Sequence, residues 1–303
     1  MAYNCVVLIK QVPDTKSITG QAMNDDGTVN RAALPAIFNP EDLNALELAL
    51  QIKDEFGGQV TVITMGPPAA SSILRDSLFR GADDAVLITD IRCAASDTLA
   101  TSYILNCAVK KVDYDIVLCG RQAIDGDTAQ VGPQLAEKLG IPQITYVEEL
   151  IELNDSTITA RRNIGAGWQE VKTALPVLLT VTSDANEPRV AAAKKMMRYK
   201  SARTPIEIEK KIEADNSEAD EADIKALAAH KCNELEQASL LIKQWDLDFI
   251  GADLNWCGRG GSPTKVHRIQ SVVLATKESK NVEPNDAAIS DMIHELIEDK
   301  IIA

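Results

Sequence analysis

The residues best placed to do chemistry in this chain form a glycine-containing turn, GRQAIDGDTAQVGP, at 120–133. The turn follows an apolar run and leads into a helical pattern, so backbone N–H groups at the helix start could bind an anion. Gly126 permits a tight turn and a close approach of the backbone to a ligand. Two interpretations stay open: a nucleotide phosphate bound at the turn, or a helix simply capped by Asp127 or Thr128.

The charge of this turn restricts what it could bind. The turn lacks the lysine of a triphosphate-binding loop and carries two carboxylates, Asp125 and Asp127. Those carboxylates would repel a phosphate unless they point away from it or bind ribose hydroxyls. We therefore expect a monophosphate or diphosphate held by backbone N–H groups, and not catalysis on a magnesium triphosphate.

Other kinds of catalytic or metal site find little support. The three histidines, His230, His267 and His294, have no serine or cysteine partner pattern for a triad. No cluster of cysteines and histidines predicts a metal site. The six cysteines are scattered without a C-x-x-C pair, so we expect reduced thiols, as in a cytoplasmic protein.

A run of cations is the second feature that could carry function, and it stands out in a chain of 303 residues with a net charge of −14. One interpretation is a solvated arm. The other is a docking segment in which Met196, Met197 and Tyr199 add an adaptable contact surface. The cations are Arg189, Lys194, Lys195, Arg198, Lys200 and Arg203.

The elements that must position these residues alternate between strand and helix. Each predicted strand is a short, continuous apolar run, which is typical of a buried strand. Asn39 and Ser96 are expected to cap two of the helices. The alternation predicts an α/β fold with a mostly parallel, doubly wound sheet, whose ligands bind at the carboxyl ends of the strands. Strands are predicted at 4–10, 59–66, 84–90 and 114–120, and helices at 39–58, 67–82, 96–112 and 128–140.

The pattern changes after Pro142. Further strand-like runs follow without long helices between them, so we expect a mixed or antiparallel extension of the sheet. A small hairpin is expected at 21–35. We place the α/β domain at 1–183. Residues 184–303 lack a clear core face and should form an extended arm that ends in an amphipathic helix at 286–302.

The composition excludes several classes of protein. The net charge of −14 and the pI near 4.7 argue against nucleic-acid binding. No apolar run is long enough to cross a membrane, and the N-terminus lacks the features of a secretion signal. We therefore expect a cytoplasmic protein without membrane insertion.

Several segments, in the same order along the chain, resemble the beta subunits of electron transfer flavoproteins. The resemblance covers most of residues 1–205, and the turn and NEPR are its most diagnostic parts. It implies a heterodimer with an alpha subunit, in which the α/β domain of the beta subunit holds an adenine nucleotide without hydrolysing it. The segments are IKQVPDT at 9–15, NPEDLNALELAL at 39–50, GADDAVLITD at 81–90, GRQAIDGDTAQVGPQLAEKLGIP at 120–142, LPVLLTV at 175–181 and NEPR at 186–189.

The resemblance also implies the nucleotide contacts, which fall on the strand ends already expected to meet. Backbone N–H groups from Gly126 to Gln130 would hold the pyrophosphate, and Asn39 and Asp42 would support the adenosine side. The implied cofactor-binding residues are Leu8, Asn39, Pro40, Glu41, Asp42, Met65, Gly120, Arg121, Gln122, Ala123, Ile124, Asp125, Gly126, Asp127, Thr128, Ala129, Gln130 and Val131.

Two branches of the family differ in this nucleotide. Ordinary members hold AMP, and their single redox FAD lies mainly on the alpha subunit. Electron-bifurcating members hold a second FAD in the beta subunit, which takes a hydride from NADH. Ordinary members continue the turn with Asn-Gln-Thr, whereas this chain has Ala129, Gln130 and Val131, which leaves room. The resemblance therefore favours FAD, with AMP as the alternative.

The same resemblance implies partners. The arm after NEPR would dock an acyl-CoA dehydrogenase-type flavoenzyme, and its remainder would wrap the alpha subunit. In the bifurcating branch, ferredoxin is a possible acceptor for one of the two electrons. The implied partner-binding residues are Asn186, Glu187, Pro188, Arg189, Lys194, Lys195, Met196, Met197, Arg198 and Tyr199.

An alternative of another class is an adenine-nucleotide sensor of the universal-stress type. Such a sensor has no use for a basic arm.

Overall fold

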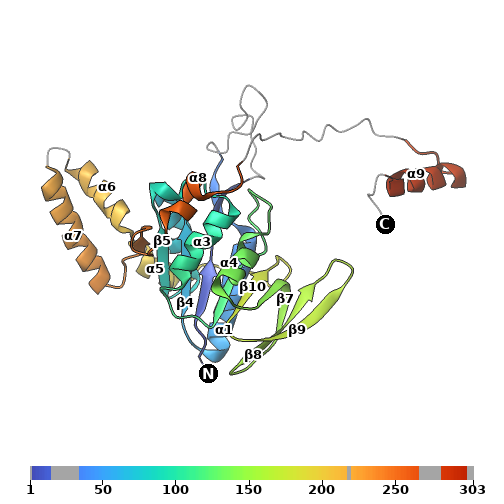
Figure 1. Cartoon of the computed structure of the whole chain (residues 1–303), viewed down its shortest axis with the longest axis horizontal. Helices are drawn as coiled ribbons and strands as arrows, with labels where there is room; N and C mark the ends of the chain where they lie inside the picture. Colours follow the sequence, from blue (N-terminus) through green and yellow to red (C-terminus); the bar gives the residue numbers. More distant parts are fainter. Residues whose placement is uncertain (1, 15–33, 217–219, 266–280, 299–303) are drawn as a thin grey trace.

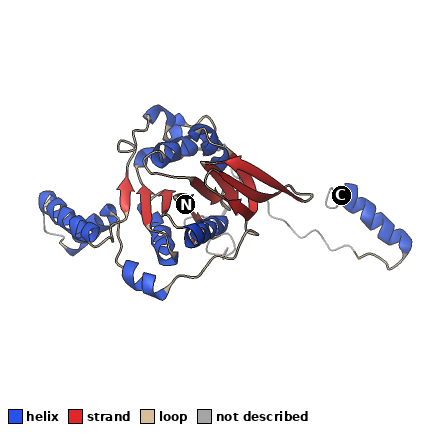
Figure 2. Cartoon of the chain, turned by 90° about the horizontal axis from the view of Figure 1, so that it is seen from below, coloured by secondary structure: helices blue, strands red, loops and turns tan. Residues whose placement is uncertain are grey.

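The computed structural model describes residues 2–14, 34–216, 220–265 and 281–298. Within these residues, a nine-stranded sheet with helices on both faces forms the centre of the molecule (Figures 1 and 2). The strands lie in the order β11 (Lys243–Trp245), β5 (Asp84–Ile88), β4 (Val60–Met65), β1 (Cys5–Leu8), β6 (Ile116–Gly120), β10 (Val177–Val181), β7 (Gln143–Leu153), β8 (Thr157–Asn163) and β9 (Trp168–Ala174).

The pairing of the strands confirms the predicted fold class. Every pairing from β11 to β7 is parallel, whereas β8 and β9 extend one edge as antiparallel strands. A separate antiparallel pair joins β2 (Gln11–Pro13) to β3 (Ala36–Phe38). The hairpin expected at 21–35 lies outside the described residues, except for its last two.

The central strands bury both faces, each under its own hydrophobic core. In β1, Cys5 and Val7 face one core, which contains α1 (Pro40–Phe56) and α2 (Ser71–Arg80). Val6 and Leu8 face the other core, which contains α3 (Thr98–Val109) and α4 (Val131–Leu139). Because successive side chains alternate across a strand, a strand covered on both faces must be apolar throughout.

The start of α3 differs from the prediction. The helix begins at Thr98, and Asp97 caps it: the Asp97 carboxylate accepts a hydrogen bond from Ala100 N at 2.9 Å. The Ser96 hydroxyl instead donates to the carbonyl of Cys93 at 2.8 Å. The expectation that Ser96 caps this helix is therefore wrong, because the carboxylate one residue later is the stronger acceptor for the free N–H groups.

The start of α4 also differs. The helix begins at Val131, three residues later than predicted, so neither Asp127 nor Thr128 caps it. Asp127 and Ala129 have φ values of +48° and +51°, which a right-handed helix does not accommodate. The turn before α4 is therefore longer than the sequence pattern indicated.

Residues after 184 contribute helices and one further strand. The expected C-terminal helix is confirmed as α9, whereas β11, which completes the sheet beside β5, was not predicted. α6 and α7 pack on each other and project from one side of the sheet (Figures 1 and 2). The helices are α5 (Ala193–Tyr199), α6 (Pro205–Asp215), α7 (Glu221–Gln237), α8 (Gly258–Gly261) and α9 (Asp286–Glu298). Short 3₁₀ turns span Pro68–Ala70, Ile91–Cys93 and Leu254–Trp256.

The cysteines are all free, and Cys5, Cys119 and Cys257 are buried. Burial raises the pKa of Cys5 to about 12, so its thiol stays protonated and unreactive at neutral pH. The free thiols agree with the expectation that the cysteines are reduced. As for the helices, none in the described ranges is long and apolar enough to cross a lipid bilayer.

Candidate nucleotide-binding site

Three strand ends and a helix start meet at one edge of the sheet. β1 ends at Leu8, β4 at Met65 and β6 at Gly120, and β1 pairs in parallel with both of the others. α1 begins at the same edge, with Asn39 N donating to the carbonyl of Lys10 at 3.0 Å. The residues expected to contact a nucleotide are therefore brought together, although they come from distant parts of the chain.

Asn39 fastens the turn to the start of α1. Its side chain is buried and does not cap the helix, so that expectation is wrong. Asn39 Nδ2 instead donates to the carbonyl of Gln122 at 2.9 Å, and Asn39 Oδ1 accepts from Ile124 N at 3.1 Å. An amide side chain can accept from an N–H and donate to a carbonyl at the same time. If Asn39 capped the helix instead, the Gln122 carbonyl and the Ile124 N–H would lose these partners. Asn39 thus holds the backbone of the turn in place.

Asp42 joins the ends of β1 and β6. Its carboxylate accepts hydrogen bonds from Lys10 N at 2.8 Å and from Gly120 N at 2.9 Å. Burial raises the pKa of Asp42 to about 7, although its hydrogen bonds oppose this effect. Gly120 is required here, because a Cβ would lie 2.5 Å from Asp42 Oδ1 and 2.8 Å from the carbonyl carbon of Glu41. Both oxygens of Asp42 are therefore engaged by the fold.

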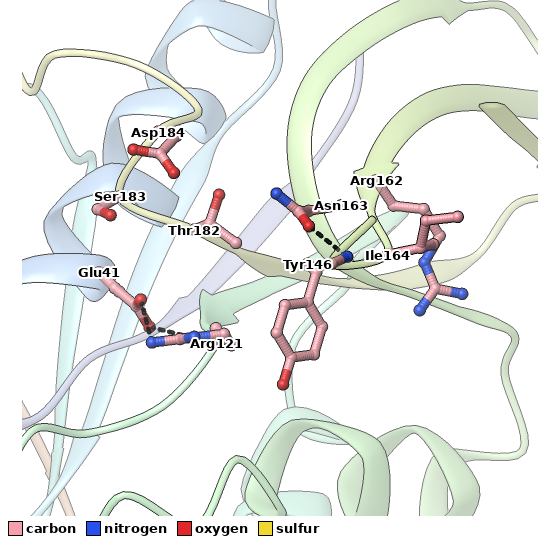
Figure 3. A pocket seen from close by; sticks show the side chains of 10 residues that line it. Glu41, Arg121, Tyr146, Arg162, Asn163, Ile164, Thr182, Ser183 and Asp184 are labelled. Atoms are coloured by element: carbon pink, nitrogen blue, oxygen red, sulfur yellow. Dashed lines mark hydrogen bonds and ion pairs between the residues drawn. The ribbon is translucent and has the colours of Figure 1, made fainter. Parts of the chain in front are cut away.

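Glu41 holds the first residues of the turn. Its carboxylate accepts from Gln122 N at 2.9 Å and pairs with Arg121 Nη2 at 3.0 Å (Figure 3). The Arg121 guanidinium lies 5.6 Å from the ring centre of Tyr146, whose φ of +58° is rare for a bulky residue. These three residues line a cavity of about 510 Å³ beside the turn. Tyr146 lies inside an ordinary strand pattern, so no sequence signal could have identified it.

The two carboxylates of the turn both have partners within the chain. Asp125 forms an ion pair with Lys10, with Nζ 2.7 Å from Oδ1. Asp127 Oδ1 accepts a hydrogen bond from Gln122 Nε2 at 3.0 Å. Lys10 was not among the predicted site residues, although its place at the carboxyl end of the first predicted strand was a usable signal. Because Lys10 offsets the charge of Asp125, the turn should repel a phosphate less than its sequence indicated.

Gly126 does not serve the conformation of the turn as we expected. The left-handed positions are Asp127 and Ala129, and Gly126 is not among the residues with positive φ. Gly126 N and Asp127 N both donate to the carbonyl of Ala123, at 3.2 and 2.9 Å. A Cβ at Gly126 would meet no described atom within 4 Å, so any requirement for glycine here would have to come from a bound ligand.

The residues that follow present a row of backbone donors. In the described part of the chain, the N–H groups of residues 128–130 meet no acceptor. Ala129 is left-handed with φ +51°, and Gln130 is right-handed with φ −99° and ψ −30°. Such an alternation is typical of a nest, a backbone pattern whose successive N–H groups can bind an anion. This nest at 128–130 lies directly before α4, whose own first N–H groups have no acceptor within the helix.

The residues expected to bind a partner divide into three groups. Asn186 and Arg189 face the body of the protein, where Asn186 donates to the backbone carbonyl of Asn44 and Arg189 pairs with the carboxylate of Glu47, both in α1. Pro188, Lys195 and Tyr199 are each partly buried. Burial, together with the nearby positive charge of Lys53, lowers the pKa of Lys195. The remaining members are exposed: Glu187, Lys194, Met196, Met197 and Arg198.

Known proteins resemble this chain over most of its length. A family model described as an electron transfer flavoprotein domain matches residues 26–227. The electron transfer flavoprotein subunit beta of Clostridium acetobutylicum is 42% identical over 277 residues, which cover 91% of this chain and 89% of that protein. The acryloyl-CoA reductase electron transfer subunit gamma of Anaerotignum propionicum is 49% identical over 187 residues, 60% of this chain and 69% of that protein. Protein FixA of Azotobacter vinelandii is 37% identical over 289 residues, 93% and 89% of the two chains. The chain therefore belongs to the electron transfer flavoprotein family, among its beta subunits.

Proposed function

We propose that the protein is the nucleotide-holding subunit of a heterodimeric electron carrier. Together with an alpha subunit, it passes electrons between NADH or ferredoxin and an acyl-CoA dehydrogenase-type flavoenzyme. The nest at 128–130 carries this proposal, because it offers N–H groups to a phosphate, while the turn itself has no lysine that would assist phosphate transfer. The protein positions the cofactor and sets its electrostatic surroundings, and the cofactor supplies the redox chemistry.

The nest would hold the pyrophosphate of an adenine dinucleotide at the start of α4. The partial positive charge at a helix N-terminus favours an anion there. Asn39 and Glu41 would act indirectly, since their side chains fix the backbone of Gln122 and Ile124. Retention of the nucleotide would therefore depend on a preorganised backbone more than on charged side chains.

FAD is our preferred nucleotide, with AMP as the alternative. Ala129 and Val131 place no polar side chain beside the nest, and the space at Gly126 is open. A group larger than adenosine monophosphate could therefore continue past the phosphates. When bound, the flavin would accept a hydride from NADH and release electrons one at a time, which is the chemistry that bifurcation requires.

We assign nucleotide binding to residues 1–183 and partner docking to residues 184–303. A cytoplasmic location would suit the six free cysteines, which an oxidising compartment tends to pair. Membership of the flavoprotein family replaces the universal-stress-type sensor as an explanation of the α/β plan.

Counting cofactors in the purified heterodimer tests the proposal. The chain is produced together with its alpha subunit, the cofactors are released by denaturation, and flavin and adenine nucleotides are quantified separately. We expect two flavins and no AMP, with loss of the visible flavin absorbance on addition of NADH. One FAD and one AMP per heterodimer would reject a second flavin in this chain, but the proposal of an electron carrier would stand. A complex without any flavin would reject the carrier itself.

A further inference from the structure

The NEPR segment is clamped to one face of α1. Asn186 Nδ2 donates to the carbonyl of Asn44 at 3.0 Å, and Asn44 Nδ2 donates to the carbonyl of Asn186 at 2.7 Å. One helical turn further along α1, Glu47 Oε2 accepts from Arg189 Nε at 2.7 Å and from Arg189 N at 3.0 Å. Asn44 and Glu47 are three residues apart, so they lie on the same face of the helix.

Arg189 is fully committed to this clamp. Besides its bonds from Nε, its Nη2 donates to Glu47 Oε1 at 3.0 Å and its Nη1 donates to Asp54 Oδ2 at 2.8 Å. Glu47 is only 7% exposed at its side chain, whereas Asp54 is 63% exposed. A planar guanidinium bound side-on by a buried carboxylate is a strong and directional contact. Arg189 is therefore turned toward the body and away from any docking partner.

The clamp continues into α2. The carbonyl of Arg189 accepts a hydrogen bond from Arg80 Nη1, and Ala192 N donates to the carbonyl of Phe79 at 3.0 Å. Val190, between these anchors, is 84% exposed, and Met197, after them, is 65% exposed. The arm thus has an inner side that is fixed at several points and an outer side that is free.

We propose that Asn44 and Glu47 are positioning residues for partner docking, because they hold the arm at 190–198 in one conformation before a partner arrives. This inference rests on the proposed function, in which the arm docks a flavoenzyme. A loose arm would have to be ordered during association, and apparent affinity falls in proportion to the fraction of protein in the competent conformation. Electron transfer inside the docked complex would not change, since neither residue touches the cofactor site.

Hydrogen exchange on the purified heterodimer, compared between the wild type and Glu47→Gln, tests the clamp without any partner. The variant keeps the length of the side chain but weakens its bonds to Arg189. We expect amides at 186–199 to exchange about tenfold faster, because losing one charge-assisted hydrogen bond typically weakens protection from exchange by about that factor. Amides of the turn at 120–131 should be unaffected. Glu55→Gln, an exposed carboxylate on the same helix, is the matched control and should change neither segment. Unchanged exchange at 186–199 in Glu47→Gln would overturn the clamp.

Steady-state electron transfer to a purified short-chain acyl-CoA dehydrogenase tests the docking role. For Glu47→Gln we expect the KM for the dehydrogenase to rise about tenfold with kcat unchanged, and Glu47→Asp to restore part of the loss. Faster exchange with an unchanged KM would overturn the docking role while keeping the clamp. A wild-type complex that reduces no acyl-CoA dehydrogenase would overturn the proposed function and the docking role together, and the exchange result would still decide whether the clamp exists.

Discussion

Asp42 is subject to two opposing effects at the edge of the nucleotide site. Its burial favours the neutral carboxylic acid, but its two oxygens accept hydrogen bonds from Lys10 N and Gly120 N, which favours the carboxylate. Burial is the larger effect and brings the pKa of Asp42 to about 7. The carboxyl that joins β1 to β6 therefore titrates close to physiological pH.

Asp42 should consequently link stability to pH. Its folded-state pKa of about 7 lies above the value of about 3.9 that an aspartate has in an unfolded chain. The folded protein binds this proton more tightly, so the stabilisation is complete below about pH 4 and is lost as the pH rises through about 7. Relative to Asp42→Asn, the wild type should gain unfolding free energy as the pH falls from about 8 to about 5, by at most about 1.4 kcal/mol per pH unit.

Urea denaturation at a series of pH values measures this difference. Glu55→Gln, an exposed carboxylate on the same helix, should show no such slope relative to the wild type. Parallel stability curves for the wild type and Asp42→Asn would mean that the two N–H donors keep Asp42 ionised throughout the range.

At the scale of the elements, two glycines of the same turn have different roles. A Cβ at Gly120 would collide with Asp42 and with the backbone of Glu41, so Gly120→Ala must separate β6 from the start of α1. We expect a loss of about 1–3 kcal/mol in unfolding free energy together with loss of bound nucleotide.

Gly126 has open space and no left-handed φ. Gly126→Val should leave the unfolding free energy within about 0.5 kcal/mol of the wild type but still abolish nucleotide retention.

Thermal or urea unfolding and the adenine content of the purified heterodimer separate the two cases. Stable Gly126→Val protein with a full complement of nucleotide would show that the turn does not approach the ligand at this residue. Gly120→Ala protein of normal stability would show that the helix start can move away from the strand at little cost.

The parallel half of the sheet was predictable because both faces of each strand are covered. Val6 and Leu8 had to be as apolar as Cys5 and Val7, and such a run is easily read from a sequence. β11 could not be predicted in this way. It is a three-residue edge strand in a charged segment, and only its pairing with β5 makes it a strand. The start of α4 was misplaced because nothing in the sequence shows that Asp127 and Ala129 adopt left-handed backbone.

For the site, the sequence and family resemblance predicted which residues meet but not what each one bonds to. Asn39 was expected to cap a helix and instead fixes the turn, because its amide bonds to the backbone of Gln122 and Ile124, more than eighty residues away along the chain. The Lys10–Asp125 pair depends in the same way on a contact across 115 residues. Local patterns carry propensity, whereas these bonds depend on tertiary proximity.

At the scale of the whole molecule, the charge is unevenly distributed. The chain has a net charge of −14, yet cations gather in the arm. Arg189 is used by the clamp on α1, and Lys195 is partly buried with a pKa lowered by its burial. Lys194 and Arg198 are exposed, next to the exposed side chain of Met197. Two exposed positive charges of the arm therefore lie close in sequence to an apolar contact residue.

Reversing these two charges should slow association with the flavoenzyme partner. Lys194→Glu combined with Arg198→Glu replaces an attractive patch by a repulsive one on a protein that is already acidic, so the second-order rate of electron transfer should fall about tenfold or more at low ionic strength. The defect should shrink as salt is added, because the screening length drops from about 10 Å at 0.1 M to about 3 Å at 1 M. Cofactor content should stay normal.

The matched control is Lys210→Glu with Lys211→Glu, which makes the same change of charge on exposed residues of α6, in the helical pair that projects from the sheet. Stopped-flow rates over a range of salt concentrations distinguish the outcomes. An equal loss in both double variants would indicate that net charge alone governs encounter. A loss confined to the variant changed at Lys194 and Arg198 would identify the segment 190–198 as the surface that partners meet first.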